Sequence, residues 1–198
     1  NNDLNLFSDL DNDDNQGVAG RLNAHQRLLT KNWTLDAFAN VQFVQKDFRT
    51  IERLFTIEFD RDWNLTSPTG NQSLVISGLR WNHPEKGFAT YQLEKLDFSD
   101  NFSGIRHVLN GRIRHKNWTI FNNSSVMKSD GSFANSTFAR SETQVKYDWK
   151  KNWVGGSRRL EDNSEKRITT NTFSPLSQRF MEYGGFAGRG DSTKVFME

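Results

Sequence analysis

The sequence predicts an all-β protein, built as an antiparallel meander of about eleven or twelve long strands. Apolar and polar residues alternate with period two along most of the 198 residues, whereas helical periodicity is almost absent. Residues typical of turns recur between these runs, and all three Pro residues fall within such turns. Many runs cover about 10–15 residues, although the mean strand of soluble proteins has only about 5–6.

The composition excludes several classes of protein. The chain has 16 Phe, 6 Trp and 3 Tyr, enough large side chains to bury surface, so an intrinsically disordered protein is not expected. It has no Cys, which excludes a disulfide scaffold and a Cys-based zinc site. The formal net charge of +2 gives no basic field for a nucleic-acid partner. No apolar run approaches the ~18 residues of a membrane helix.

The chain divides into an acidic, Asn/Asp-rich leader loop at residues 1–17 and the meander at 18–198, which we expect to be a fragment of a longer chain. The leader contains the best candidate for a metal site, in which side-chain oxygens alternate before a Gly, as at the start of a calcium loop. The candidate ligands are Asp9, Asp11, Asp13 and Asn15. An Asp stands where an EF-hand requires Gly, so a solvated charged turn is the alternative.

The first hairpin has the most specific pattern. With Lys31-Asn32 as a two-residue turn, apolar residues of Val18–Thr30 meet apolar residues of Trp33–Phe43, and Arg27 meets Asp36 across the strands. The predicted pairs on the apolar side are Leu28 with Leu35, Ala24 with Ala39, Leu22 with Val41, and Gly20 with Phe43, an aromatic that covers a strand glycine.

The same Lys-Asn-Trp signature recurs at 116–118 and 151–153, where it predicts two further hairpins. In the second, Ile113 would face Ile120 and Arg112 would face Phe121. In the third, Trp149 would face Val154, and Tyr147 would cover Gly156. The predicted strand count places the first of these turns at one end of the meander and the other two at the opposite end.

Other turn-like segments complete the strand count. One predicted strand, Arg49–Asp62, carries Arg53 among apolar residues. The remaining breaks are expected at 45–47, 67–71, 83–87, 98–104, 129–131, 161–163 and 188–191.

Long antiparallel meanders occur in transmembrane barrels, in soluble barrels or sandwiches, and in extended sheets of large assemblies. Strands that span an outer membrane need about 9–11 residues with alternate side chains facing lipid, and Trp beside turns is typical of an aromatic girdle. The side chains expected in a polar lumen are Arg21, His25, Arg27, Arg112 and Arg114. Apolar alternation looks the same when that face packs on a second sheet, so the soluble alternatives stay open.

A resemblance adds to this interpretation. Long strands rich in Asn, Phe and Trp, with stretches such as 36–40 (DAFAN), 49–53 (RTIER) and 61–65 (RDWNL), resemble large, poorly characterised β-rich outer-membrane proteins of Bacteroidetes-type bacteria. The resemblance implies the bacterial outer membrane or cell envelope as location and a larger parent protein. It also implies a structural or transport role in secretion, assembly or uptake, with membrane lipid and other envelope proteins as partners.

Signatures of catalysis are missing, because the chain has neither Gly-x-Ser-x-Gly nor Cys, so we do not expect an enzyme. The four His show no metal-ligand spacing, and calcium is the one cofactor considered. The alternative function is a soluble β-rich module that binds glycans or protein partners, with Trp63, Trp81 and Tyr91 as aromatic platforms. We interpret the RGD tripeptide at 189–191 as part of a flexible hairpin turn.

Overall fold

The computed structural model describes residues 17–30, 32–48, 63, 65, 69–132, 134–170, 172, 177–190 and 195–197. These residues form one antiparallel sheet in which every strand pairs with its neighbours in chain order. The strands are β1 (Ala19–Thr30), β2 (Thr34–Val44), β3 (Gln72–His83), β4 (Gly87–Phe98), β5 (Phe102–His115), β6 (Trp118–Gly131), β7 (Ala134–Trp149), β8 (Asn152–Arg167), β9 (Gln178–Arg189) and β10 (Val195–Met197).

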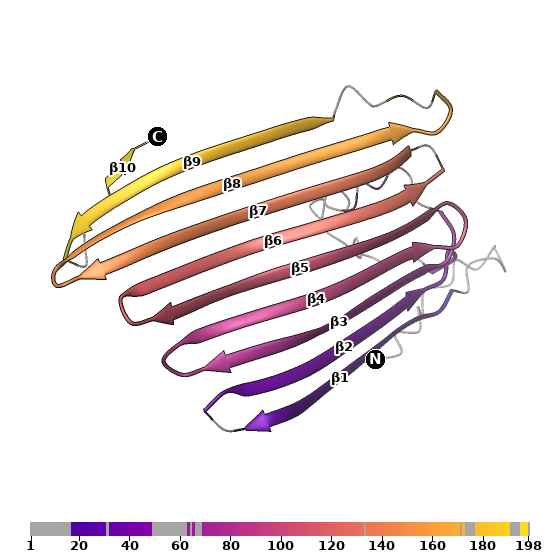
Figure 1. The fold of residues 1–198 in the computed structure, drawn as a ribbon. Coiled ribbons are helices and arrows are strands. Elements are labelled where there is room, and N and C mark those ends of the chain that lie inside the picture. The colour runs from indigo at the N-terminus through magenta and orange to yellow at the C-terminus, as the bar shows by residue number, and fades with distance from the viewer. Residues whose placement is uncertain are drawn as a thin grey trace.

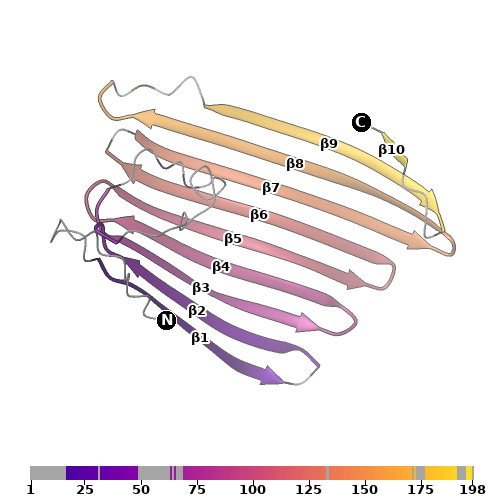
Figure 2. The same cartoon turned by 180° about the vertical axis from the view of Figure 1, so that it is seen from behind.

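The sheet is a single curved layer that is not closed into a barrel, as Figure 1 and, from behind, Figure 2 show. Strand β1 forms one edge, and the short β10 pairs with the end of β9 at the other. The prediction of an all-β antiparallel meander is therefore confirmed. The predicted leader, apart from Gly17, and the predicted strand at 49–62 lie outside the described residues.

Among the described strands, one expected break lies elsewhere, because the chain does not leave the sheet at 161–163 but only after Arg167, between β8 and β9. Residues 161–163 continue β8 and pair with residues 138–140 of β7. Their carboxylates are compensated across the strands: Arg140 Nε lies 3.6 Å from Glu161, and Arg179 Nε lies 3.7 Å from Asp162. Cross-strand charge pairs thus keep turn-forming residues in a strand. The expected break at 129–131 is also displaced, because these three residues pair with β5 and end β6. The other expected breaks overlap connections between strands, and the expected 98–104 turn contains only residues 99–101.

The register of the first hairpin is confirmed from Gly20–Phe43 to Arg27–Asp36. The pairing then shifts at a bulge, so Leu35 pairs with Leu29 rather than with the predicted Leu28. The connection consequently contains residues 31–33 between paired Thr30 and Thr34, instead of two residues. A bulge with a three-residue loop is a common solution where the sequence lacks the Asn-Gly of a type I′ turn.

The second hairpin pairs as predicted, Ile113 with Ile120 and Arg112 with Phe121. The third was predicted wrongly, because its turn is Lys150-Lys151, which pairs Tyr147 with Val154 and Trp149 with Asn152. The register moves by two residues, so every side chain keeps its face. In both hairpins the first turn residue is left-handed, with φ 52° at Lys116 and 54° at Lys150.

The three Lys-Asn-Trp segments all lie at one end of the sheet, because each follows an odd-numbered strand. The prediction that the first lies at the opposite end is wrong. We call this end, with the connections 31–33, 84–86, 116–117 and 150–151, the tight-turn end.

A small core lies on one face toward the opposite end. It consists of Trp63, Leu74, Leu96 and Met127, against which Phe98, Phe102 and Phe138 pack in part. Trp63 comes from the connection between β2 and β3, is 0% exposed, and lies over Gly104 of β5. Trp63 thus places this point of the β2–β3 connection against β5.

Candidate functional site

The sheet has two chemically different faces, and they are the candidate functional surfaces. Cross-strand partners lie on the same face of the sheet, and successive residues of a strand alternate between the two faces. The pairing therefore assigns each side chain to one face. The arginine face carries Arg27, Asp36 and Arg106 together with the small core. The apolar face carries Leu22, Leu109 and Ile120.

Burial is concentrated on the arginine face, which holds the buried apolar residues as well as the buried polar ones. Every buried residue of the described strands lies on the arginine face, including the polar residues Asp36, Gln72, Thr90, Thr119, Ser129 and Ser136. The exposed large hydrophobics of the strands lie on the apolar face, apart from Phe88, Phe180 and Leu28 at the bulge. They are Leu22, Leu29, Val41, Phe43, Val75, Tyr91, Ile105, Leu109, Ile113, Trp118, Ile120, Val126, Trp149, Val154, Met181 and Tyr183.

The apolar face of β1–β7 contains a wide band without Asp, Glu, Lys or Arg. In β5 the band runs from His107 to His115, and in β1 it begins at Ala24. The eight residue steps from His107 to His115 correspond to about 26 Å along the strand. In a strand tilted by about 40° this covers about 20 Å of the bilayer, and the apolar band of outer-membrane barrels is about 25 Å tall.

Charged and aromatic residues border this band. Toward the end opposite the tight turns lie Lys128, Asp130 and the pair formed by Lys95 and Asp97, whose Nζ and Oδ2 are 3.0 Å apart. At the tight-turn end the turns carry Lys86, Lys116, Lys150 and Lys151.

Aromatic rings lie just inside the tight-turn end. Tyr147 contacts Trp118 on the neighbouring strand, with ring centroids 4.7 Å apart, and stacks on Trp149 at 6.1 Å. Trp33 meets the ring of His83 edge-on at 4.8 Å. Rings with one polar edge are favoured where an apolar surface meets water.

The band ends at β8. Arg158 lies on the apolar face there, and Asp162 of β8 faces Arg179 of β9. This part of the face has the mixed charge of an ordinary protein surface.

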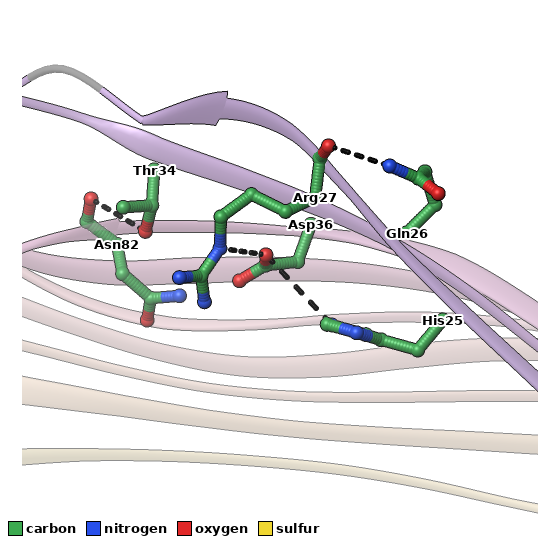
Figure 3. A network of polar contacts seen from close by, with 6 residues as sticks. All are labelled: His25, Gln26, Arg27, Thr34, Asp36 and Asn82. Atoms are coloured by element: carbon green, nitrogen blue, oxygen red, sulfur yellow. Dashed lines mark hydrogen bonds and ion pairs between the residues drawn. The ribbon is translucent and has the colours of Figure 1, made fainter.

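The arginine face contains one dense polar network, which Figure 3 shows. Arg27 Nε donates a hydrogen bond to Asp36 Oδ1 at 2.8 Å across β1 and β2, and His25 Nε2 lies 3.7 Å from the same oxygen. The predicted Arg27–Asp36 pair is confirmed.

Arginine dominates the rest of this face over β1–β6. It carries Arg21, Arg27, Arg80, Arg106, Arg112 and Arg114, against two carboxylates, Asp36 and Glu94. Arg106 Nη1 lies 3.8 Å from Glu94 Oε2. Both carboxylates therefore already have an arginine partner.

The structure offers no assembled metal site in the residues it describes. The calcium candidates Asp9, Asp11, Asp13 and Asn15 lie outside them, and no group of three or more His, Asp or Glu there is arranged to hold a metal ion. His107 and His115 share the apolar face of β5, and His107 Nδ1 lies 2.8 Å from Tyr91 Oη.

The predicted glycan platforms are only partly available. Trp63 is 0% exposed and packs on the core, so it cannot stack on a sugar from solvent. This correction follows from its place in the β2–β3 connection, against β5, which the alternation pattern does not predict. Trp81 and Tyr91 lie on the apolar face, where Tyr91 is exposed and Trp81 half-buried.

Sequence reasoning missed Arg80 and Arg106 on the arginine face and the Trp118–Tyr147–Trp149 cluster. The alternation of the two faces along the segments 72–83 and 102–115 is the sequence signal that could have assigned both arginines to this face. The aromatic cluster depends on the register of β6 and β7, which brings Trp118 opposite Tyr147.

No helix among the described residues has the length and apolarity needed to cross a membrane. Comparison with protein-family models, with curated proteins and with solved structures found no match.

Proposed function

We propose that the chain forms part of the wall of an outer-membrane β-barrel, as a non-enzymatic structural or transport component of a bacterial envelope complex for secretion, assembly or uptake. The observation that supports this most is the exposed apolar face. Exposed apolar side chains occupy a charge-free band over seven strands, while the buried polar residues lie with the small core on the other face. A sheet between lipid and a polar lumen has this distribution.

The borders of the band support the same proposal. Lysines on the tight turns and rings such as Trp118 and Trp149 lie where side chains would reach the headgroup layer. Strands β1–β9 have 11–16 residues, so each reaches the about 9–11 needed to span. The open edges require further strands for closure, and the charged part of the face on β8 and β9 suits contact with protein.

Vesicle flotation tests this proposal. The purified chain is refolded with phosphatidylcholine vesicles and centrifuged through a sucrose gradient after washing with carbonate. We expect it to float with the vesicles and to retain its β-sheet circular dichroism spectrum. Recovery of folded chain at the bottom of the gradient would contradict insertion into lipid.

A glycan-binding module is the second candidate, because Trp118, Tyr147 and Trp149 form an exposed aromatic cluster that could also stack on sugars. Glycan-array binding by the detergent-free chain, abolished by Trp118→Ala but not by Trp63→Phe, would favour this function. A folded chain that floats with vesicles and binds no glycan would exclude it.

A further inference from the structure

We propose that the arginine face over β1–β6 binds multiply charged anions that carry phosphate or sulfate groups. This inference goes beyond the proposed function and does not depend on it, because the face would be exposed to water in a barrel lumen and in a soluble sheet alike.

The first support is charge. The whole chain is close to neutral, with 26 basic and 24 acidic residues, yet the arginine face of β1–β6 carries six arginines and two carboxylates. On the same face of β7–β9 acidic and basic residues alternate, and Arg140 pairs with Glu161 there. The positive charge is therefore concentrated on one region of one face.

The second support is the lack of close ion pairs. Within the described part of the chain, no carboxylate lies at ion-pair distance from Arg80, Arg112 or Arg114, and all three are exposed. Arg80 stands opposite Asp36 and interacts with it only over a longer distance. In contrast, Arg27 and Arg106 each pair with a carboxylate. The unpaired guanidinium groups are thus available to a ligand.

The third support is residue type. Every cation on this face of β1–β6, other than His25, is an arginine, whereas the lysines of the same segment lie on the other face or in turns. The planar guanidinium group offers paired donors that match phosphate, sulfate and carboxylate oxygens, which the ammonium group of lysine does not.

The spacing favours a ligand with several anionic groups. Arg80 and Arg112 lie two strands and two residues apart, so their Cα atoms are separated by about 12 Å, and Arg114 is two residues further along β5. Thr90 and Asn110 lie beside Arg80 in the same cross-strand row and add hydrogen-bonding groups. One small monoanion cannot contact all three arginines, but a polyanion can.

Isothermal titration calorimetry of the purified chain in dodecyl maltoside tests the proposal with three probes: inositol hexakisphosphate, sucrose octasulfate and uncharged sucrose. We expect both anions to bind, sucrose not to bind, and the affinity to fall as salt is raised. The tighter of the two anions identifies phosphate or sulfate as the preferred group. Absence of binding by both anions would overturn the proposal.

Two triple variants separate a specific face from net charge. Arg80→Gln/Arg112→Gln/Arg114→Gln removes three charges from the arginine face, whereas Lys128→Gln/Arg158→Gln/Lys166→Gln removes three from the apolar face. We expect the first to weaken binding about tenfold or more and the second less than about twofold. Equal losses in both variants, each with an unchanged circular dichroism spectrum, would refute binding at this face. Neither result bears on flotation with vesicles.

Discussion

Phe186 of β9 lies directly over Gly155 of β8, its cross-strand partner. A Cβ atom on Gly155 would be 2.1 Å from Phe186 Cε2 and 2.5 Å from the backbone oxygen of Val145. The neighbouring Gly156 would meet nothing closer than 3.6 Å. Two adjacent glycines in one strand therefore differ in whether they can carry a side chain.

Gly155→Ala should lower the free energy of unfolding by about 1–3 kcal/mol, because overpacking displaces Phe186 and a backbone oxygen cannot move away easily. Gly156→Ala should change it by less than about 1 kcal/mol. Urea denaturation followed by circular dichroism measures both. A larger loss for Gly156→Ala than for Gly155→Ala would show that the packing of these two positions is described wrongly.

Trp63→Ala should lower the free energy of unfolding by about 3–5 kcal/mol, because it removes the largest side chain of the core over Gly104. Trp118→Ala is the matched control, since Trp118 is 47% exposed, and it should cost only about 1 kcal/mol. Equal denaturation midpoints for the two variants would mean that the β2–β3 connection does not hold Trp63 against the sheet.

The membrane proposal predicts that a lysine is tolerated at one of two adjacent positions of β5 but not at the other. Leu109 lies in the charge-free band and Asn110 on the arginine face. Leu109→Lys should destabilise the chain folded in phospholipid vesicles by about 2–4 kcal/mol, whereas Asn110→Lys should have little effect. Urea denaturation from the vesicles measures the difference. Equal tolerance of lysine at both positions would count against lipid contact on the apolar face.

The tight turns predict a further contrast. Lys150 is left-handed with φ 54°, and Lys151 beside it has no positive φ. Lys150→Gly should stabilise the sheet by up to about 1 kcal/mol through relief of backbone strain, whereas Lys151→Gly should destabilise it by a similar amount. Thermal denaturation of the two variants tests this difference. Stabilisation by Lys151→Gly alone would mean that the left-handed residue of the turn is Lys151 and not Lys150.

The predicted aromatic cover of glycines shows where sequence reasoning stops. Gly20 does pair with Phe43, yet nothing lies within 4 Å of a Cβ built on Gly20. Aromatic rings instead lie over two other glycines: Phe38 over Gly78 and Phe186 over Gly155. Pairing follows from alternation, but the direction in which a ring leans depends on its rotamer and on the twist of the sheet.

The sequence by itself determined the all-β meander, the pairing of the first hairpin from Gly20–Phe43 to Arg27–Asp36, and the two predicted pairs of the second hairpin. Period-two alternation is a local property, and a shift of the third hairpin by two residues leaves it intact. The tertiary structure alone decided that residues 161–163 stay in β8, that Trp63 lies over Gly104, and that the buried side chains lie on the arginine face. These features depend on contacts between strands far apart in sequence, whose charges and rings compensate one another only when the sheet is assembled.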